Sequence, residues 1–121
     1  GVSQEPSALK GEAQNEDKRI NLLLDYMRAH LEREVSLDSL AGLVQCTPYH
    51  VIRLFKAKLG LSPHAYFVQL RLERARELID LGHSLSEASF LAGFSDQSHL
   101  TRRFKKRYGV TPGTYAIQKS G

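Results

Sequence analysis

The chain has 121 residues, a length that fits one compact domain or two very small domains that are tightly coupled. Its single cysteine, Cys46, excludes an internal disulfide and a cysteine-based zinc site and fits a reducing, cytoplasmic setting. No run of about 18 apolar residues is present, so no membrane span is expected. The net charge is +4, and residues 18–121 hold sixteen Lys and Arg against nine Asp and Glu. Such a basic body attracts phosphate backbones, although ordinary solubility charge would explain the excess equally well.

Residues 1 to about 15 are rich in Ser, Gln, Glu and Gly and show no period, so we expect a flexible linker or leader cut from a longer protein. From about Glu16 to Glu32, apolar residues recur at intervals of three and four, which predicts a helix with one apolar face. The members of that face are Ile20, Leu23, Leu24, Met27 and Leu31.

The next segment predicts two helices separated by a short break. Ser36 is a candidate N-cap for a short helix. Thr47 and Pro48 form an N-cap followed by proline at the first helical position, and the helix that they start runs to about Leu59. Gly60 suits a left-handed C-terminal cap. The apolar face of the short helix is Leu37, Leu40, Ala41 and Val44.

The remainder repeats this organisation. A long helix is expected over residues 63–81, followed by a capping box formed by Ser84 and Glu87. Asp96 or Ser95 caps a further helix that ends at about Tyr108, and residues 112–118 form a last short helix. No segment alternates with period two long enough to form a strand, so the expected fold is all-α with seven helices.

A sequence repeat with a spacing of 49 residues links the two halves. Residues 50–66 and 99–115 share seven of seventeen positions, namely His, Arg, Phe, Lys, Gly, Pro and Tyr. Each copy ends a helix-break-helix pattern that carries an apolar face and a basic face. Two such units at a fixed spacing favour the docking of two helices into two neighbouring grooves of DNA.

On a helical wheel, the two repeated helices each separate an inner apolar side from an outer polar side. Arg53 and Arg102 occupy the same repeat position at the centre of each outer face. The planar fork of arginine can pair bidentately with guanine in the major groove. A lone exposed arginine would more often be a solvated surface residue, but two matching ones favour a shared task. The inner sides are Val51, Leu54, Phe55 and Leu59 in one helix and Leu100, Phe104 and Tyr108 in the other.

Several neighbouring residues keep more than one interpretation. Ile52 either contacts a thymine methyl or packs against a neighbouring helix. Tyr49 either stacks on sugar, reaches a phosphate or shields the core edge. His50 and His99 either hold the turn or touch backbone and phosphate, and no second ligand stands at metal spacing, so no metal site is expected. Later lysines and arginines of both helices suit phosphate contacts, which supply affinity without sequence choice.

The motifs resemble an AraC/XylS-type DNA-binding domain over about residues 18–118. The first half matches through Tyr49-His50-Val51-Ile52-Arg53-Leu54-Phe55-Lys56 and Gly60-x-Ser62-Pro63-x-x-Tyr66. The second half matches through Ala92-Gly93-Phe94-Ser95-Asp96-Gln97-Ser98-His99-Leu100 and Tyr108-Gly109-Val110-Thr111-Pro112-x-x-Tyr115. The second motif is long and specific.

This resemblance implies two helix-turn-helix subdomains, at about 16–62 and 82–118, joined by a linker helix at about 63–81. Their second helices would enter adjacent major grooves. Family members usually activate transcription by recruiting RNA polymerase, and many carry an N-terminal effector-binding or dimerisation domain, which is expected to be missing here. The implied base-reading residues are Tyr49, Ile52, Arg53, Gln97, Ser98, Thr101 and Arg102. The expected phosphate contacts are Thr47, His50, Lys56, Lys58, His99, Arg103, Lys105 and Lys106.

Three departures from the family pattern concern packing and not the groove-facing residues. Ala88-Ser89 stands where Ile-Ala is usual, which predicts slightly loose packing, and Leu100 is often Phe in relatives. Gln45 replaces a common Gly and should be strained if the turn needs a left-handed residue.

Two other function classes compete with DNA binding. A helical protein-interaction module could bind an acidic partner through the basic face, and it would lack sequence preference among polyanions. An enzyme is not expected, because the sequence offers no nucleophile-base-orienter set, no phosphate-cradling glycine loop and no metal cluster. No cofactor is expected either.

Overall fold

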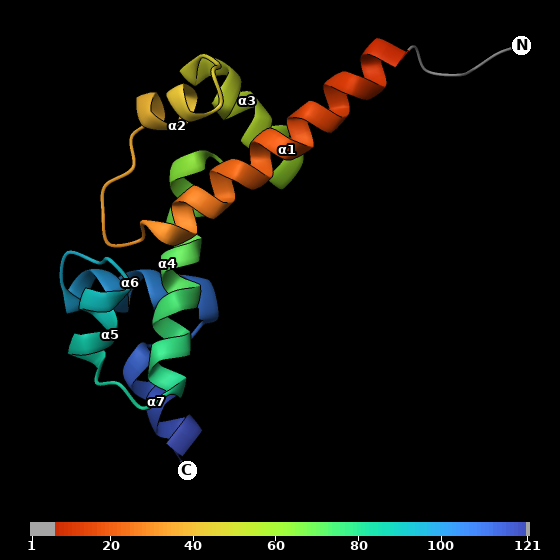
Figure 1. Ribbon diagram of the computed structural model, residues 1–121. Helices are drawn as coiled ribbons and strands as arrows, with labels where there is room; N and C mark the ends of the chain where they lie inside the picture. The colour runs from red at the N-terminus through yellow and green to blue at the C-terminus, as the bar shows by residue number, and fades with distance from the viewer. Residues whose placement is uncertain (1–6, 121) are drawn as a thin grey trace, which may run out of the picture. The chain divides into compact units, whose positions relative to one another are not determined.

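The computed structural model describes residues 7–120, and within that range the chain forms seven helices and no strand (Figure 1). This confirms the all-α expectation. None of the helices in the described range is both long and apolar enough to cross a membrane. The helices are α1 (Ser7–Ala29), α2 (Leu37–Leu43), α3 (Pro48–Leu59), α4 (Pro63–Asp80), α5 (Leu85–Leu91), α6 (Gln97–Tyr108) and α7 (Pro112–Ser120).

The first helix differs from its expected bounds at both ends. The leader expected up to about residue 15 is already helical from Ser7, while residues 1–6 lie outside the described residues. The segment contains Ala, Leu, Lys, Glu and Gln, which favour helix, so propensity outweighs the missing apolar period. At the other end α1 stops at Ala29, and Leu31 is buried in the connection that follows.

The chain divides into two compact units and passes between them three times. The first unit comprises the residues up to Ala29 together with Val35–Pro63. The second comprises His30–Glu34 together with the residues from His64 onward. The helix expected as a linker over 63–81 is present, but from its second residue on it belongs to the second unit and contributes to that unit's core.

The first unit packs α1 and α2 against α3. The inner side expected for α3 is largely confirmed, because Val51, Leu54 and Phe55 are buried, whereas Leu59 is only half-buried. Full burial of one such side chain contributes about 1.5–3 kcal/mol. The other buried apolar residues from α1, from α2 and from the α2 C-cap are Ile20, Leu23, Leu24, Met27, Leu40, Ala41 and Val44.

The second unit builds its core from α4, α5 and α6, with α7 packed against α6. Leu100 and Phe104 of α6 are completely buried, as expected, and Tyr108 is half-buried. The hydroxyl of Tyr115 on α7 donates a hydrogen bond of 2.7 Å to the Asp80 carboxylate at the end of α4. The α4 and α5 contributions are Val68, Leu72, Ala75, Leu78, Ile79 and Ala88.

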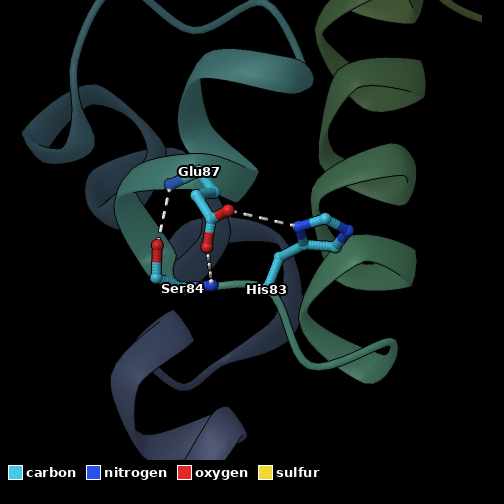
Figure 2. A network of polar contacts seen from close by, with 3 residues as sticks. All are labelled: His83, Ser84 and Glu87. Carbon is cyan, nitrogen blue, oxygen red and sulfur yellow. Dashed lines mark hydrogen bonds and ion pairs between the residues drawn. The ribbon is translucent and has the colours of Figure 1, made fainter.

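The capping box expected at the start of α5 is confirmed (Figure 2). The backbone N–H of Glu87 donates to Ser84 Oγ at 3.1 Å, and the backbone N–H of Ser84 donates to Glu87 Oε1 at 3.0 Å. Donation by the Ser84 backbone lowers the pKa of the Glu87 carboxyl below its ordinary value. His83 adds a contact, with its Nδ1 lying 3.7 Å from Glu87 Oε2.

A hydrogen-bonded arginine holds the connection after α1 to the second unit. Arg71 of α4 donates from Nε to the carbonyl of Leu31 and from Nη2 to the carbonyl of Arg33, both at 2.7 Å. Its guanidinium also lies over the Phe67 ring, 4.3 Å from the centroid. These two charge-assisted bonds explain why His30–Glu34 clusters with the second unit although α1 precedes it.

Candidate nucleic-acid interface

The turns that lead into α3 and α6 share one backbone geometry. The helix before each turn is followed by a left-handed residue, Gln45 with φ 56° and Gly93 with φ 93°. The turn thus does need a left-handed residue at this position, which is the condition under which Gln45 was expected to be strained. In both turns the next N–H donates to the carbonyl five residues earlier, which is the Schellman pattern. These bonds run from Cys46 to Ala41 at 2.9 Å and from Phe94 to Ser89 at 3.0 Å.

The turn into α6 is one residue longer than the turn into α3. Thr47 follows Cys46 directly, and its Oγ1 accepts the backbone N–H of His50 at 3.1 Å. In the second turn Ser95 intervenes, and Asp96 is the N-cap, accepting the backbone N–H of His99 at 2.7 Å. The two candidate caps for α6 thus divide their tasks, since the Ser95 hydroxyl lies 3.4 Å from His99 Nδ1.

The outer face of α3 combines aromatic, aliphatic and cationic side chains. Tyr49 is 69% exposed and Ile52 is 39% exposed, so Ile52 is not fully covered by a neighbouring helix. The guanidinium of Arg53 lies 5.7 Å from the centre of the Tyr49 ring. Such a cation–π contact restricts the arginine while leaving its N–H groups able to donate. Three of the predicted base-reading residues therefore share one exposed surface.

The outer face of α6 gathers the other four predicted base-reading residues. Together they line an open hollow of about 530 Å³. Thr101 is half-buried, and its Oγ1 donates to the carbonyl of Gln97 at 2.9 Å, one helical turn earlier. This pairing commits the threonine hydroxyl to the backbone. The lining residues are Gln97, Ser98, Thr101 and Arg102.

The expected phosphate-contacting residues differ in whether they already contact another group of the chain. Arg103, Lys105 and Lys106 of α6 are exposed and form no ion pair with the rest of the described chain. Lys56 of α3 places Nζ 3.5 Å from the carbonyl of Gly60. Lys58 is different, because its Nζ lies 2.8 Å from the Asp17 carboxylate, and that contact raises the lysine pKa. A phosphate would have to compete with Asp17 for this lysine.

The two repeated histidines, His50 and His99, lie near the turns that precede α3 and α6. The Nε2 atom of His50 is buried and has no hydrogen-bond partner within residues 7–120, so a phosphate contact would have to use its other ring nitrogen. His99 packs edge-on against Phe94, with ring centroids 5.2 Å apart. Burial, followed by the nearby Arg103, lowers the His99 pKa and favours the neutral ring. Within the described chain no group of three metal-ligating side chains occurs.

Three contacts at this surface were not foreseen from the sequence. They are the stacking of Arg53 on Tyr49, the bond from Thr101 to Gln97 and the position of Arg107 over the Tyr108 ring. The i, i+4 spacing of a threonine and its acceptor is a usable signal for the second. Tyr49 and Arg53 share that spacing, so the sequence permits their stacking as well, and the side-chain rotamers decide whether it forms.

A helix-turn-helix domain family matches residues 40–118, which is more than half of the chain. The chain is 32% identical over 107 residues to the HTH-type transcriptional activator RhaS of Escherichia coli, covering 88% of this chain and 38% of RhaS. It is 31% identical over 101 residues to the HTH-type transcriptional regulator MtrA of Neisseria gonorrhoeae, covering 83% and 34%. The chain thus spans less than half the length of these curated relatives.

Solved structures agree with this match. An AraC-type transcriptional regulator from Chromobacterium violaceum superposes with a TM-score of 0.80 at 28% identity, covering 88% of this chain and 96% of that one. The DNA-binding domain of AdpA, solved in complex with a target DNA, has the same fold, with a TM-score of 0.73 at 21% identity and coverage of 79% and 87%. Together with the paired turns and recognition-type helices described above, these matches show that the chain belongs to the AraC-type family of helix-turn-helix transcriptional regulators.

Proposed function

We propose that this domain binds a specific double-stranded DNA site through α3 and α6 and thereby regulates, by activation, the transcription of nearby genes. The observation that carries the proposal is the repeat of one arrangement. In each unit a left-handed turn presents a capped helix of twelve residues, and an arginine stands at the same repeat position on its exposed face.

The chemistry of the two faces fits the major groove. Arg53 and Arg102 offer planar donors for guanine, and Gln97 offers an amide that pairs with adenine. Tyr49 and Ser98 flank the arginines on the exposed side of their helices. We assign the base-reading role to all seven residues expected from the sequence, including Ile52 and Thr101.

The remaining cations position the domain on the duplex. Arg103, Lys105 and Lys106 carry no competing carboxylate among the described residues, which suits them to phosphate contacts. Thr47, His50, Lys56, Lys58 and His99 complete the proposed set, with Lys58 contributing only when it leaves Asp17. We expect α6 to supply the larger part of the salt-dependent affinity.

Binding by both helices at once would place them about one helical turn apart, in adjacent major grooves on one side of the duplex. We propose on this basis that residues of about 16–62 and 82–118 act as two DNA-reading subdomains connected through α4. The name of RhaS as an activator supports positive regulation, and recruitment of RNA polymerase would be the route.

A complete protein would contain more than this domain. Because the relatives are more than twice as long as their matched segments, we propose that an effector-binding or dimerisation domain accompanies this one in a complete protein. A regulator that reads the genome acts where the bacterial chromosome lies, in the cytoplasm. We propose no catalytic activity and no cofactor for the chain.

The test is selection of bound duplexes from a randomised pool, followed by titration of the recovered sequence against random DNA and against heparin in rising salt. A specific reader prefers its site by roughly a thousandfold or more. Equal, salt-sensitive binding to all three polyanions would overturn the proposal and favour a module that binds an acidic partner.

A further inference from the structure

In each recognition helix one residue directly precedes the outward arginine. Ile52 and Thr101 occupy the same position of the 49-residue repeat, directly before Arg53 and Arg102. One is aliphatic and the other is a hydroxyl residue, so by sequence they differ in polarity. In the structure this difference is much reduced.

Thr101 has already committed the proton of its hydroxyl. Its Oγ1 donates to the carbonyl of Gln97 at 2.9 Å, so that group cannot donate to a base edge as well. A threonine in a helix that bonds back to the preceding turn points its oxygen at the backbone and its methyl elsewhere. Thr101 nevertheless lines the open hollow of α6 together with Ser98 and Arg102. Thr101 can therefore offer a ligand there no donor, only its methyl and the acceptor lone pairs of Oγ1, and we take the methyl as the group that contacts the base.

Ile52 also presents an aliphatic group to the surface, and it does so without a hydrogen bond to the backbone. It is 39% exposed on the flank of a face whose other members are Tyr49 and Arg53. A partly exposed isoleucine beside a guanidinium gains free energy when an apolar group covers it. In the major groove the apolar group on a base edge is the thymine methyl.

We infer that both recognition helices read the same two-base element, in which a methyl-bearing side chain contacts the thymine methyl of one base pair and the following arginine pairs with guanine in the neighbouring pair. This inference rests on the proposed function and names the ligand more closely. Each half-site then contains a G·C pair next to a T·A pair.

The two helices differ in how firmly they hold the arginine. Arg53 lies over the Tyr49 ring, 5.7 Å from its centroid, whereas the corresponding neighbour of Arg102 is Ser98, which has no ring to offer. The first helix should therefore be the stricter reader of guanine, because its guanidinium loses less conformational freedom on binding.

The experiment uses duplexes recovered by the protein from a randomised pool, with single thymines replaced by deoxyuridine. This replacement deletes one methyl and leaves every hydrogen-bonding group in place. We expect about a fourfold loss of affinity for each critical thymine, the value for uncovering one methyl-sized group. Because the first comparison needs no protein variant, it stands even if a variant folds poorly.

Two surface variants assign each methyl to its reader. Ile52→Ala should abolish the deoxyuridine effect in one half-site only, and Thr101→Ser, which keeps the hydroxyl, should abolish it in the other only. A preferred sequence that is insensitive to deoxyuridine, or whose sensitivity survives both variants, overturns the inference while the proposed function stands. A pool that yields no preferred sequence overturns the proposed function itself.

Discussion

The turn before α3 and the turn before α6 make the same backbone bonds with different residues, and their surroundings differ. Gly93 faces the connection after α1, where a Cβ atom would lie 1.9 Å from the carbonyl oxygen of Leu31 and 2.8 Å from Nε of Arg71. Gln45, at the matching turn position, carries a full side chain that is exposed. The same turn position is thus packed closely against its neighbours in the second unit and is exposed in the first.

The outer faces differ the other way, since Lys58 on α3 has a carboxylate partner while the cations on α6 have none within residues 7–120. On α3, Lys58 is paired with Asp17 and the exposed surface is dominated by Tyr49, Ile52 and Arg53. On α6, Arg103, Lys105 and Lys106 have no carboxylate partner among the described residues. The comparison teaches that the second unit is the more constrained in packing and the more cationic on its surface, so its turn and its charges should tolerate substitution less.

The largest expected effect comes from exchanging the turn residues. Gly93→Ala should lower the free energy of unfolding of the second unit by about 3 kcal/mol or more, because positive-φ strain adds to a clash with backbone. Gln45→Gly, the matched change in the first unit, should raise stability slightly, by about 0.5–1 kcal/mol, since it relieves left-handed strain. Urea denaturation of both variants measures this; similar effects of the two would contradict the difference in packing.

Next come the matching arginines. Arg53→Ala and Arg102→Ala should each weaken binding to the selected site by about 1–3 kcal/mol and relax base preference at one position. Arg74→Ala removes an equal charge from the exposed Arg74–Glu77 pair on α4 and serves as the control. Affinities on selected and random duplexes decide the matter, and an equal loss on both kinds of DNA speaks against base reading.

A smaller gain is expected inside the second core. Ser89 is 3% exposed and its Oγ has no partner within residues 7–120, while the matching position of the first unit is Ala41. Ser89→Ala should raise the free energy of unfolding by about 1 kcal/mol, because an unsatisfied buried hydroxyl is removed. Thermal unfolding tests this, and a lower melting temperature would show that the hydroxyl has a partner in solution.

Asp17→Asn should release Lys58 from its ion pair. The exposed face of α3 would then resemble that of α6 in carrying a lysine without a carboxylate partner in the described chain. The magnitude of the slope of log affinity against log salt should increase by about one unit, as expected for one additional phosphate contact. Asp25→Asn, at the weaker 3.8 Å pair with Arg28 on the same helix, is the matched control. Identical slopes for both variants would exclude Lys58 from the phosphate-contacting set.

The smallest effect concerns the capping box at the start of α5. The lowered pKa of Glu87 means that its ionised form is favoured in the folded state, so its stabilisation is present above the unfolded pKa and is lost as the pH falls through the folded pKa. Glu87→Ala should therefore lower the free energy of unfolding near pH 7. At low pH the substitution should have no effect on stability. Unfolding midpoints of both proteins across that range should converge; a constant gap would contradict the electrostatic cause.

Much of this architecture could be predicted because the signals are local. Ser84 with Glu87, Thr47 with Pro48 and the periodic apolar residues state where helices begin and which side they bury. The extension of α1 to Ser7 was missed because the segment 7–15 has helix-forming residues without an apolar period. The capture of residues 30–34 by Arg71 could not be predicted, because it depends on a contact between segments about forty residues apart.

For the interface, sequence could rank the outward side chains but not their partners. Arg53 and Arg102 follow from the wheel and the repeat, whereas the engagement of Lys58 by Asp17 requires knowledge of how α1 packs on α3. The committed hydroxyl of Thr101 lies between these cases, since its spacing permits the bond and only the rotamer decides it.

The most direct test of simultaneous docking in adjacent grooves is the affinity for the selected duplex after about 5 or about 10 base pairs are inserted between its half-sites, roughly half a turn or one turn. We expect the half-turn insertion to reduce binding to the level of a single half-site, because the second groove then faces away from the protein. Undiminished affinity with the half-turn insertion would contradict the account.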